Sequence, residues 1–242
     1  MMGFNHVSCG LAAGLATLPL VPLHTWPAQT TWVVAAGGTA LLPDLDSRQS
    51  TAARMWGPLT ELLAGMVATL ARGDRWGTHD LVLAPLAGAG VTLLATTNPW
   101  TLGLLLALLT GLALRGLVLA GAGRIGGTIN LIISATAAWW LVTHAAGHLQ
   151  LLPLIVALGI AVHILGDFLT EEGVPMPILW ILGDRRRLAV QAFHTNSLLE
   201  RALVAPALSL LGVWLFCQRA GIHDVPTLVA WSGDLVRALT RS

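Results

Sequence analysis

Two side chains of the metal-ligand type, His163 and Asp167, stand at the end of a long apolar run. Because they are four residues apart, a helix would place them on one face, about one turn from each other. Ionisable groups within an apolar helix are costly and point to a functional site by default. An imidazole and a carboxylate at this spacing suit Zn²⁺, Mn²⁺ or a similar cation. The alternative is a pair that only locks two helices together.

The composition predicts the elements that must carry these side chains. Hydrophobic residues make up 55% of the 242 residues and charged residues 10%, and the mean hydropathy is +0.74. A soluble domain carries about 25% charged residues, so the composition predicts an all-α, polytopic membrane protein. No cleavable signal peptide is expected, because Arg48 is the first basic residue. The formal net charge is +1 and no basic arm is present, so we expect no direct nucleic-acid binding.

Seven apolar runs predict about seven membrane spans. They cover residues 7–23, 31–42, 81–96, 102–120, 129–144, 151–168 and 198–216. The first two are short against the ~20 residues that cross a bilayer, so we expect them to tilt, to re-enter or to thin the membrane. Residues 57–70 are typical of an amphipathic or partly buried helix. We expect one membrane-embedded domain over residues 1–220, followed by a tail or interfacial helix at 221–242.

The order of the spans groups the polar residues. If each run crosses once, one side of the membrane receives His6, Asp44, Asp46, His79, Asp80, His163 and Asp167. The same side receives most arginines, namely Arg48, Arg54, Arg72, Arg75, Arg124 and Arg185 to Arg187, whereas the other side has Arg219, Arg237 and Arg241. By the positive-inside rule the polar group faces the cytoplasm, and residues 57–70 form a helix on that side.

Several of these residues have a structural alternative. Asp44 and Asp46 follow Pro43, where aspartate supports turns through backbone hydrogen bonds. Asp80 could cap the next helix, and His6 could be an interfacial histidine. His79 has no comparable structural explanation. Two carboxylates two residues apart in a loop can also bind or bridge cations, which a turn alone does not require.

A set of short motifs resembles the YdjM-like family of inner-membrane-associated, metal-dependent hydrolases, some members of which are called LexA-binding. The motifs are Asn5-His6, Leu41-Leu42-Pro43-Asp44-Leu45-Asp46-Ser47, Arg75 with Thr78-His79, His163-Ile164-Leu165-Gly166-Asp167 with Thr170 and Gly173-Val174-Pro175, and Thr195-Asn196-Ser197 with Glu200. That family is distantly similar to zinc-dependent phospholipase C and P1-type nucleases. The resemblance implies a helical fold and the metal ligands His6, Asp44, His79, His163 and Asp167, with Asp46 as an additional carboxylate.

The chemistry of such a cluster predicts hydrolysis. One to three divalent cations, zinc foremost with manganese or magnesium as alternatives, would activate water and neutralise charge on a phosphoryl oxygen. Asp46 or Asp80 could act as the general base, and Arg75 could hold a phosphate. Arg185 to Arg187 could do the same, or could serve only topology and lipid contact. We therefore expect a membrane hydrolase acting on a phosphoester of a lipid or a lipid-linked phosphate.

Other enzyme classes fit less well, and two non-enzymatic functions stay open. The chain has no HExxH motif, no GxSxG motif and no lysine, which argues against site-2-type proteases, serine hydrolases and PAP2-type phosphatases. One alternative is a non-catalytic scaffold that docks a soluble protein partner through its arginine-rich face. The other is a metal-ion transporter, which predicts polar groups continuing through the membrane interior.

Overall fold

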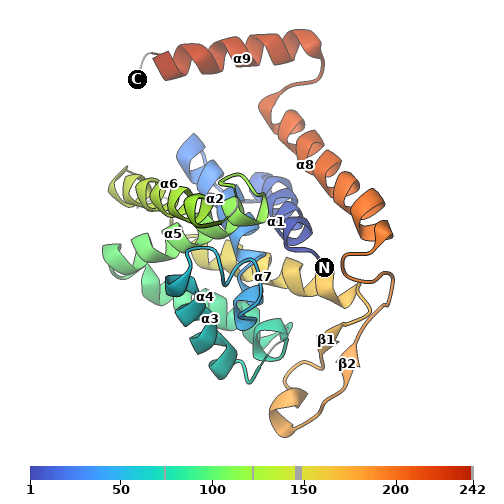
Figure 1. Ribbon diagram of the computed structural model, residues 1–242. Coiled ribbons are helices and arrows are strands. Elements are labelled where there is room, and N and C mark those ends of the chain that lie inside the picture. The colour runs from blue at the N-terminus through green and yellow to red at the C-terminus, as the bar shows by residue number, and fades with distance from the viewer. Residues whose placement is uncertain (74, 122, 145–148, 241–242) are drawn as a thin grey trace.

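The computed structural model describes residues 1–73, 75–121, 123–144 and 149–240. These residues are mostly helical, as the sequence predicts. The helices are α1 (Gly3–Thr17), α2 (Trp26–Thr39), α3 (Pro58–Leu70), α4 (Leu83–Ala95), α5 (Pro99–Gly116), α6 (Gly123–His144), α7 (Leu152–Phe168), α8 (Ala205–Ala220) and α9 (Val225–Thr240). A small antiparallel hairpin pairs β1 (Val174–Pro175) with β2 (Arg187–Leu188), with Val174 opposite Leu188 and Pro175 opposite Arg187. It extends from the end of α7 (Figure 1).

Local sequence signals set several helix ends. Proline occupies the first turn of α2, α3, α5, α7 and α8, where its missing N–H costs no hydrogen bond. At α5 the Asn98 side chain also accepts a hydrogen bond from the Trp100 amide at 2.8 Å. Gly221 ends α8 in the left-handed conformation, with φ 68°.

Helix α2 lies at the centre and packs against α1, α5 and α7. Small residues allow this close approach, as they do between membrane helices. A methyl group at Gly38 would collide with the Leu109 carbonyl oxygen of α5, and one at Gly159 of α7 would collide with the Thr39 hydroxyl of α2. The core around these contacts includes the fully buried Ala36. The end of α2 is therefore fixed against α7, where the polar residues gather.

The predicted number of membrane spans is wrong. Three helices in the described part of the chain are long and apolar enough to cross a membrane: Pro99–Gly116, Gly123–His144 and the continuous helix Glu200–Ala220. The other predicted spans form helices of 13 to 17 residues. At about 1.5 Å per residue these are only about 20–25 Å long, which is less than the ~30 Å hydrocarbon core.

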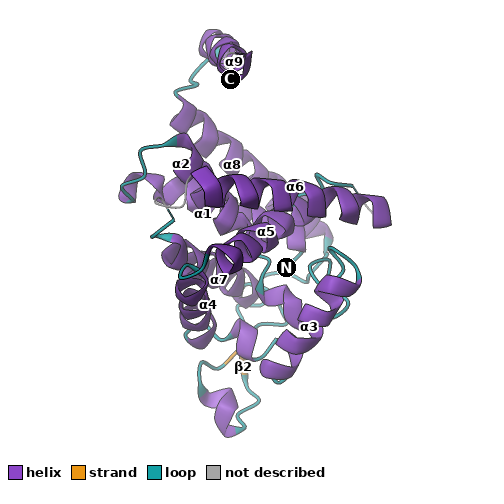
Figure 2. Ribbon diagram, turned by 90° about the vertical axis from the view of Figure 1, so that its left-hand side faces the viewer, coloured by secondary structure: helices purple, strands orange, loops and turns teal. Residues whose placement is uncertain are grey.

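The predicted helix at residues 57–70 is present as α3. Leu62, Met66 and Leu70 of this helix are exposed, whereas Thr60 and Ala64 are buried. Within the predicted tail the structure describes residues 221–240, which include the helix α9, and residues 241–242 lie outside the described residues. Helix α9 lies apart from the other helices in both ribbon views, whereas α8 packs against α1 (Figures 1 and 2). Large apolar side chains of α8, including Leu210 and Trp214, are exposed.

A candidate metal centre

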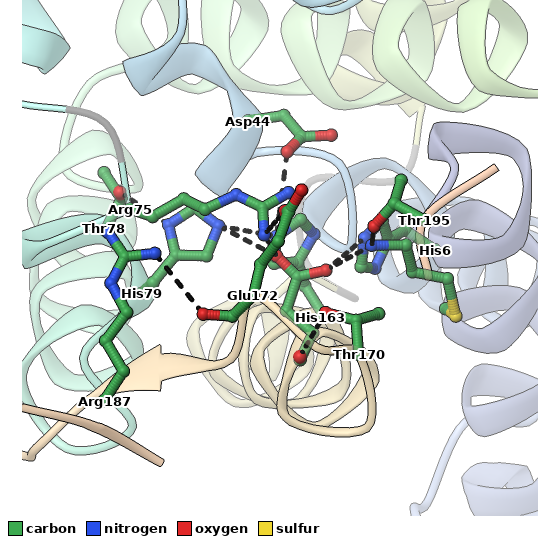
Figure 3. A network of polar contacts seen from close by, with 12 residues as sticks. His6, Asp44, Arg75, Thr78, His79, His163, Thr170, Glu172, Arg187 and Thr195 are labelled. Carbon is green, nitrogen blue, oxygen red and sulfur yellow. Dashed lines mark hydrogen bonds and ion pairs between the residues drawn. The ribbon is translucent and has the colours of Figure 1, made fainter. Parts of the chain in front are cut away.

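Four segments bring histidines and aspartates to one buried place. His6 lies in the first turns of α1, and Asp44 lies in a 3₁₀ turn (Pro43–Asp46) just beyond α2. His79 ends a second 3₁₀ turn (Gly77–His79) before α4, and His163 and Asp167 lie near the end of α7. The histidines and Asp167 are buried, and the Asp44 side chain is 22% exposed. We call these five residues the His/Asp cluster; Figure 3 shows the four that it labels pointing toward one another.

Three members of the cluster have the geometry of a metal-binding group. His79 Nε2 lies 3.1 Å from His163 Nε2 and 3.3 Å from Asp167 Oδ2. His163 Nε2 lies 3.7 Å from the same aspartate oxygen. Ligands about 2.0–2.1 Å from a tetrahedral zinc ion are about 3.3 Å apart, so these separations match the edges of such a tetrahedron. His79, His163 and Asp167 could hold a metal ion.

A second group shares His163 with the first. His6, Asp44 and His163 could also hold an ion. The rings of His6 and His163 stack with centroids 3.8 Å apart, and Asp44 Oδ1 lies 3.8 Å from His163 Nε2. His6 Nε2 lies 3.1 Å from Asp167 Oδ1, so the two groups are in direct contact.

The remaining histidine nitrogens are held from behind. His163 Nδ1 lies 2.8 Å from the Ala40 carbonyl oxygen, which can only accept a hydrogen bond. His79 Nδ1 lies 3.3 Å from Asp46 Oδ2. Both contacts favour a proton on Nδ1 and leave the Nε2 lone pair directed into the cluster, which is the usual arrangement around metal-ligating histidines.

Asp46 lies behind His79 and not among the inward-facing groups. Its Oδ2 accepts a hydrogen bond from the Arg75 amide at 2.8 Å and another from the Thr78 hydroxyl. Within the described residues neither metal-binding group includes Asp46. Its contacts are those of a residue that orients a ligand.

The electrostatics of the loop residues follow from these contacts. Burial opposes ionisation of Asp46, but hydrogen bonds from His79, Thr78 and Arg75 outweigh it and hold the pKa of Asp46 below its usual value. Burial also disfavours a charged His79, yet hydrogen bonds to Asp167 and Asp46 raise the pKa of His79 to about 9. Partial burial raises the pKa of Asp44. The Asp46 and Asp167 carboxylates thus make the surroundings of His79 attractive to positive charge.

Unsatisfied atoms in the cluster support a cation at this place. Among the described residues, His6 Nδ1 has no hydrogen-bond partner, and the contacts of His6 Nε2 with Asp167 Oδ1 (3.1 Å) and of Asp167 Oδ2 with His79 Nε2 (3.3 Å) are ion-pair contacts without good hydrogen-bond geometry. Buried polar atoms without partners are rare and call for an explanation. Imidazole and carboxylate are the donor set that zinc and manganese accept. The Met1 ammonium group lies 2.6 Å from Asp167 Oδ1, so this carboxylate already contacts one cation.

Arg75 reaches the cluster from its outer side. Its Nη1 lies 3.6 Å from Asp167 Oδ2 and forms an ion pair with Glu172, whose side chain is 47% exposed. The Glu172 carbonyl oxygen in turn accepts a hydrogen bond from Arg187 Nη1 at 3.4 Å. In Figure 3 the Arg75 and Glu172 side chains meet beside the imidazoles. A guanidinium at this place could bind an anionic group next to the cluster.

Asp80 has a different environment from that predicted for a general base. Its Oδ1 accepts hydrogen bonds from the Val82 and Leu83 amides, both at 2.8 Å, at the start of α4. Its Oδ2 accepts from the Ile178 amide at 2.6 Å and from Trp180 Nε1 at 2.7 Å. These bonds outweigh burial and lower the pKa of Asp80. The side chain therefore ties the His79 loop to the segment between β1 and β2.

Sequence reasoning assigned no role to Glu200, which supports the cluster from outside. The buried Glu200 accepts hydrogen bonds from the Met2 amide (2.6 Å), Asn5 Nδ2 (2.8 Å) and the Asn196 amide (2.6 Å). It thereby fixes the start of α1, next to His6. The pairing of Asn5 with His6 and of Asn196 with Glu200 in the sequence was the available signal. No comparable signal pointed to the Ala40 carbonyl or to Glu172 as a partner of Arg75.

Comparison with known proteins gives one result for the first half of the chain. A family model described as "YdjM inner membrane protein" matches residues 1–121 of the 242. The matched segment contains His6, Asp44 and His79, whereas His163 and Asp167 lie beyond it. Neither curated proteins nor solved structures gave a match.

Proposed function

The chain belongs to the YdjM inner membrane protein family, and we propose that it is a membrane-bound, metal-dependent hydrolase of phosphoesters. The observation that carries the proposal is the convergence of His79 Nε2, His163 Nε2 and Asp167 Oδ2 at 3.1 to 3.7 Å. A purely structural histidine–aspartate pair would not require a third buried group, nor two histidines whose Nδ1 atoms are both held from behind. The proposed metal is zinc, with manganese as the alternative.

A divalent cation in this cluster would activate a water molecule and offset charge on a phosphoryl oxygen. In hydrolysis a P–O bond to the water oxygen forms, the P–O bond to the alcohol breaks, and the alcohol oxygen gains a proton. With an ion held by His79, His163 and Asp167, the remaining carboxylate Asp44 is suited to take the proton from water, because it is partly exposed, lies 3.8 Å from His163 and has a raised pKa. The proposal thus moves the general base from Asp46 and Asp80 to Asp44.

The other residues have positioning roles in this proposal. Arg75 would hold an anionic phosphate oxygen beside the cluster. Asp46 would keep His79 in its orientation, and the Ala40 carbonyl would do the same for His163. We further propose that the site faces the cytoplasm, which rests on the distribution of arginines in the sequence.

The transporter alternative lacks a continuous polar path in the described residues. The buried Asn130 and Ser134 of α6 bond to each other, and Asn130 also binds the Gly111 carbonyl and Trp56 Nε1. These groups join α5 to α6 and do not extend the cluster. A scaffold that docks a soluble protein, including a LexA-like partner, is tested directly by the metal measurement.

The test is the metal content of detergent-purified protein, measured by elemental mass spectrometry after incubation with zinc or manganese. We expect about one or more ions per chain in the wild type and loss of metal in His163→Ala, because His163 belongs to both groups. His144→Ala is the matched control, since His144 is exposed and bonds Thr143 and Trp140. A wild-type protein without metal, or a His163→Ala variant that keeps all of it, would refute the proposal.

A further inference from the structure

An apolar cavity of about 390 Å³ lies beside the His/Asp cluster. Its walls come from α3, α4, α5 and α7, and α3 and α4 lie at the same end of the molecule in both ribbon views (Figures 1 and 2). The lining residues nearest the cluster in sequence are Leu42, Pro43, Leu45, Gly77, Thr78 and Ile160. The first three lie around Asp44 in sequence, and the next two directly precede His79. Ile160 lies about one helical turn before His163. The cavity is therefore continuous with the segments that build the candidate site.

Both hydroxyls in the lining already donate hydrogen bonds within the protein. The Thr92 hydroxyl donates to the Gly88 carbonyl at 2.7 Å, and the Thr78 hydroxyl donates to Asp46. The other lining side chains of α3 and α4 are apolar, for example Val67 and Leu83. Because polar groups pay a desolvation cost without a partner, the part of a ligand that enters must be hydrocarbon.

The size and position of the cavity select a slender occupant. A helix about 10 Å in diameter would fill this volume with only about one turn, so a docked protein helix is too thick. The cavity reaches the surface at Val91, which is 62% exposed. Leu70 of α3, which also lines the cavity, is exposed as well. In a family of inner membrane proteins such a surface faces lipid, and a lipid tail can enter from the side.

We infer that the substrate is a membrane lipid phosphoester whose hydrocarbon tail lies between α3 and α4 while its phosphate meets the cluster. This inference rests on the proposed phosphoesterase function and names its substrate class. Charge supports the arrangement, because Arg75 stands at the cluster and would bind the phosphate. The tail then positions the ester bond, and the hydrolysis is the one described above.

A second apolar groove, of about 580 Å³, provides an internal control. It lies between α2, α5 and α6 and is lined by residues such as Val34, Leu106 and Ala137. None of the residues that line it neighbours a cluster residue in sequence. A lipid in this groove would not contact the residues that flank the cluster in sequence.

The first test compares two substrates with metal-loaded protein in mixed micelles: dipalmitoyl phosphatidic acid and water-soluble p-nitrophenyl phosphate. Val67→Phe and Ala87→Phe fill the cavity from opposite walls. We expect each to lower the ratio of kcat/KM for the lipid to that for the soluble ester about tenfold. Ala137→Phe, in the second groove, should leave this ratio unchanged. Hydrolysis with an unchanged ratio in both cavity variants overturns the inference and leaves the proposed function standing.

The second test needs no turnover. A phosphatidic acid with a diazirine in its acyl chain is photo-crosslinked to the protein, and the modified peptides are mapped by mass spectrometry. We expect adducts in residues 63–67 and 83–91 that Val67→Phe reduces. Adducts confined to α6 and α8 overturn the inference. If neither substrate is hydrolysed, the proposed function fails, and the crosslinks alone decide whether the tail site exists.

Discussion

Replacing Asp46 by asparagine tests the division of the cluster into ligands and orienting residues. Asp46 Oδ2 contacts His79 Nδ1 at 3.3 Å and accepts hydrogen bonds from Arg75 and Thr78. Asparagine keeps the shape of the side chain and its acceptor oxygen but removes the charge that holds the imidazole. Losing such a supporting group weakens metal binding about 10- to 100-fold. Loss of a direct ligand, as in His163→Ala, should abolish stoichiometric binding.

The same change can be followed through thermal stability. At a metal concentration 100 times the wild-type Kd, binding stabilises the folded protein by about 2.7 kcal/mol. At the same metal concentration, metal binding would stabilise an Asp46→Asn variant of tenfold lower affinity by about 1.4 kcal/mol. A variant of hundredfold lower affinity would be stabilised by about 0.4 kcal/mol. The assay is isothermal titration with zinc, together with thermal unfolding in detergent with and without metal.

Two outcomes would refute this reasoning. If Asp46→Asn binds no metal, as expected for His163→Ala, Asp46 is itself a ligand, as the sequence motif implies. If its affinity equals that of the wild type, Asp46 does not orient His79. Asp184→Asn is the matched control, because Asp184 pairs with Arg186 at 2.8 Å away from the cluster and should have no effect.

Three further predictions follow from other contacts. Glu172→Gln should tighten binding of inorganic phosphate to the metal-loaded protein about two- to fivefold, because the Glu172 carboxylate competes for Arg75. Glu171→Gln is the control, and a phosphate affinity of Glu172→Gln equal to that of the wild type in titration calorimetry would contradict the prediction. Asp80→Asn should destabilise the fold by about 1–3 kcal/mol by turning one acceptor into a donor; a thermally stable but inactive variant would instead support a catalytic Asp80. Gly38→Ala should lower the unfolding temperature, since overpacking costs about 1–3 kcal/mol; an unchanged temperature would show that α2 and α5 separate easily.

The helices could be predicted from the sequence, but the number of spans could not. Every predicted apolar run overlaps a helix. Hydropathy continues through some turns, however, and there it overestimates helix length. The run at residues 7–23 is an example: α1 ends at Thr17, and Leu18–Leu20 form a separate 3₁₀ turn. Counting each apolar run as one crossing therefore assumes too many spans. The polar residues meet because α1 and α7 pack together against α2.

The residue types of the cluster could be chosen from the sequence, while the direction of each side chain could not. Asp44 and Asp46 look equivalent in the motif. In a 3₁₀ turn, with about three residues per turn, side chains two positions apart point in different directions. Asp44 consequently faces His163, and Asp46 stands behind His79. Backbone acceptors such as the Ala40 carbonyl carry no sequence signature at all. That these residues ligate a metal stays a prediction.

The sharing of His163 between both metal-binding groups has a consequence for biogenesis. Segments carrying His6, Asp44 and His79 are synthesised early, yet neither group is complete until α7 has been made and has packed against α1 and α2. A nascent chain ending at residue 121, the limit of the family match, contains His6, Asp44 and His79 but lacks His163, the residue that both groups share. Metal acquisition at the proposed centre would therefore be a late step in the maturation of the protein, after most of its apolar segments have entered the membrane.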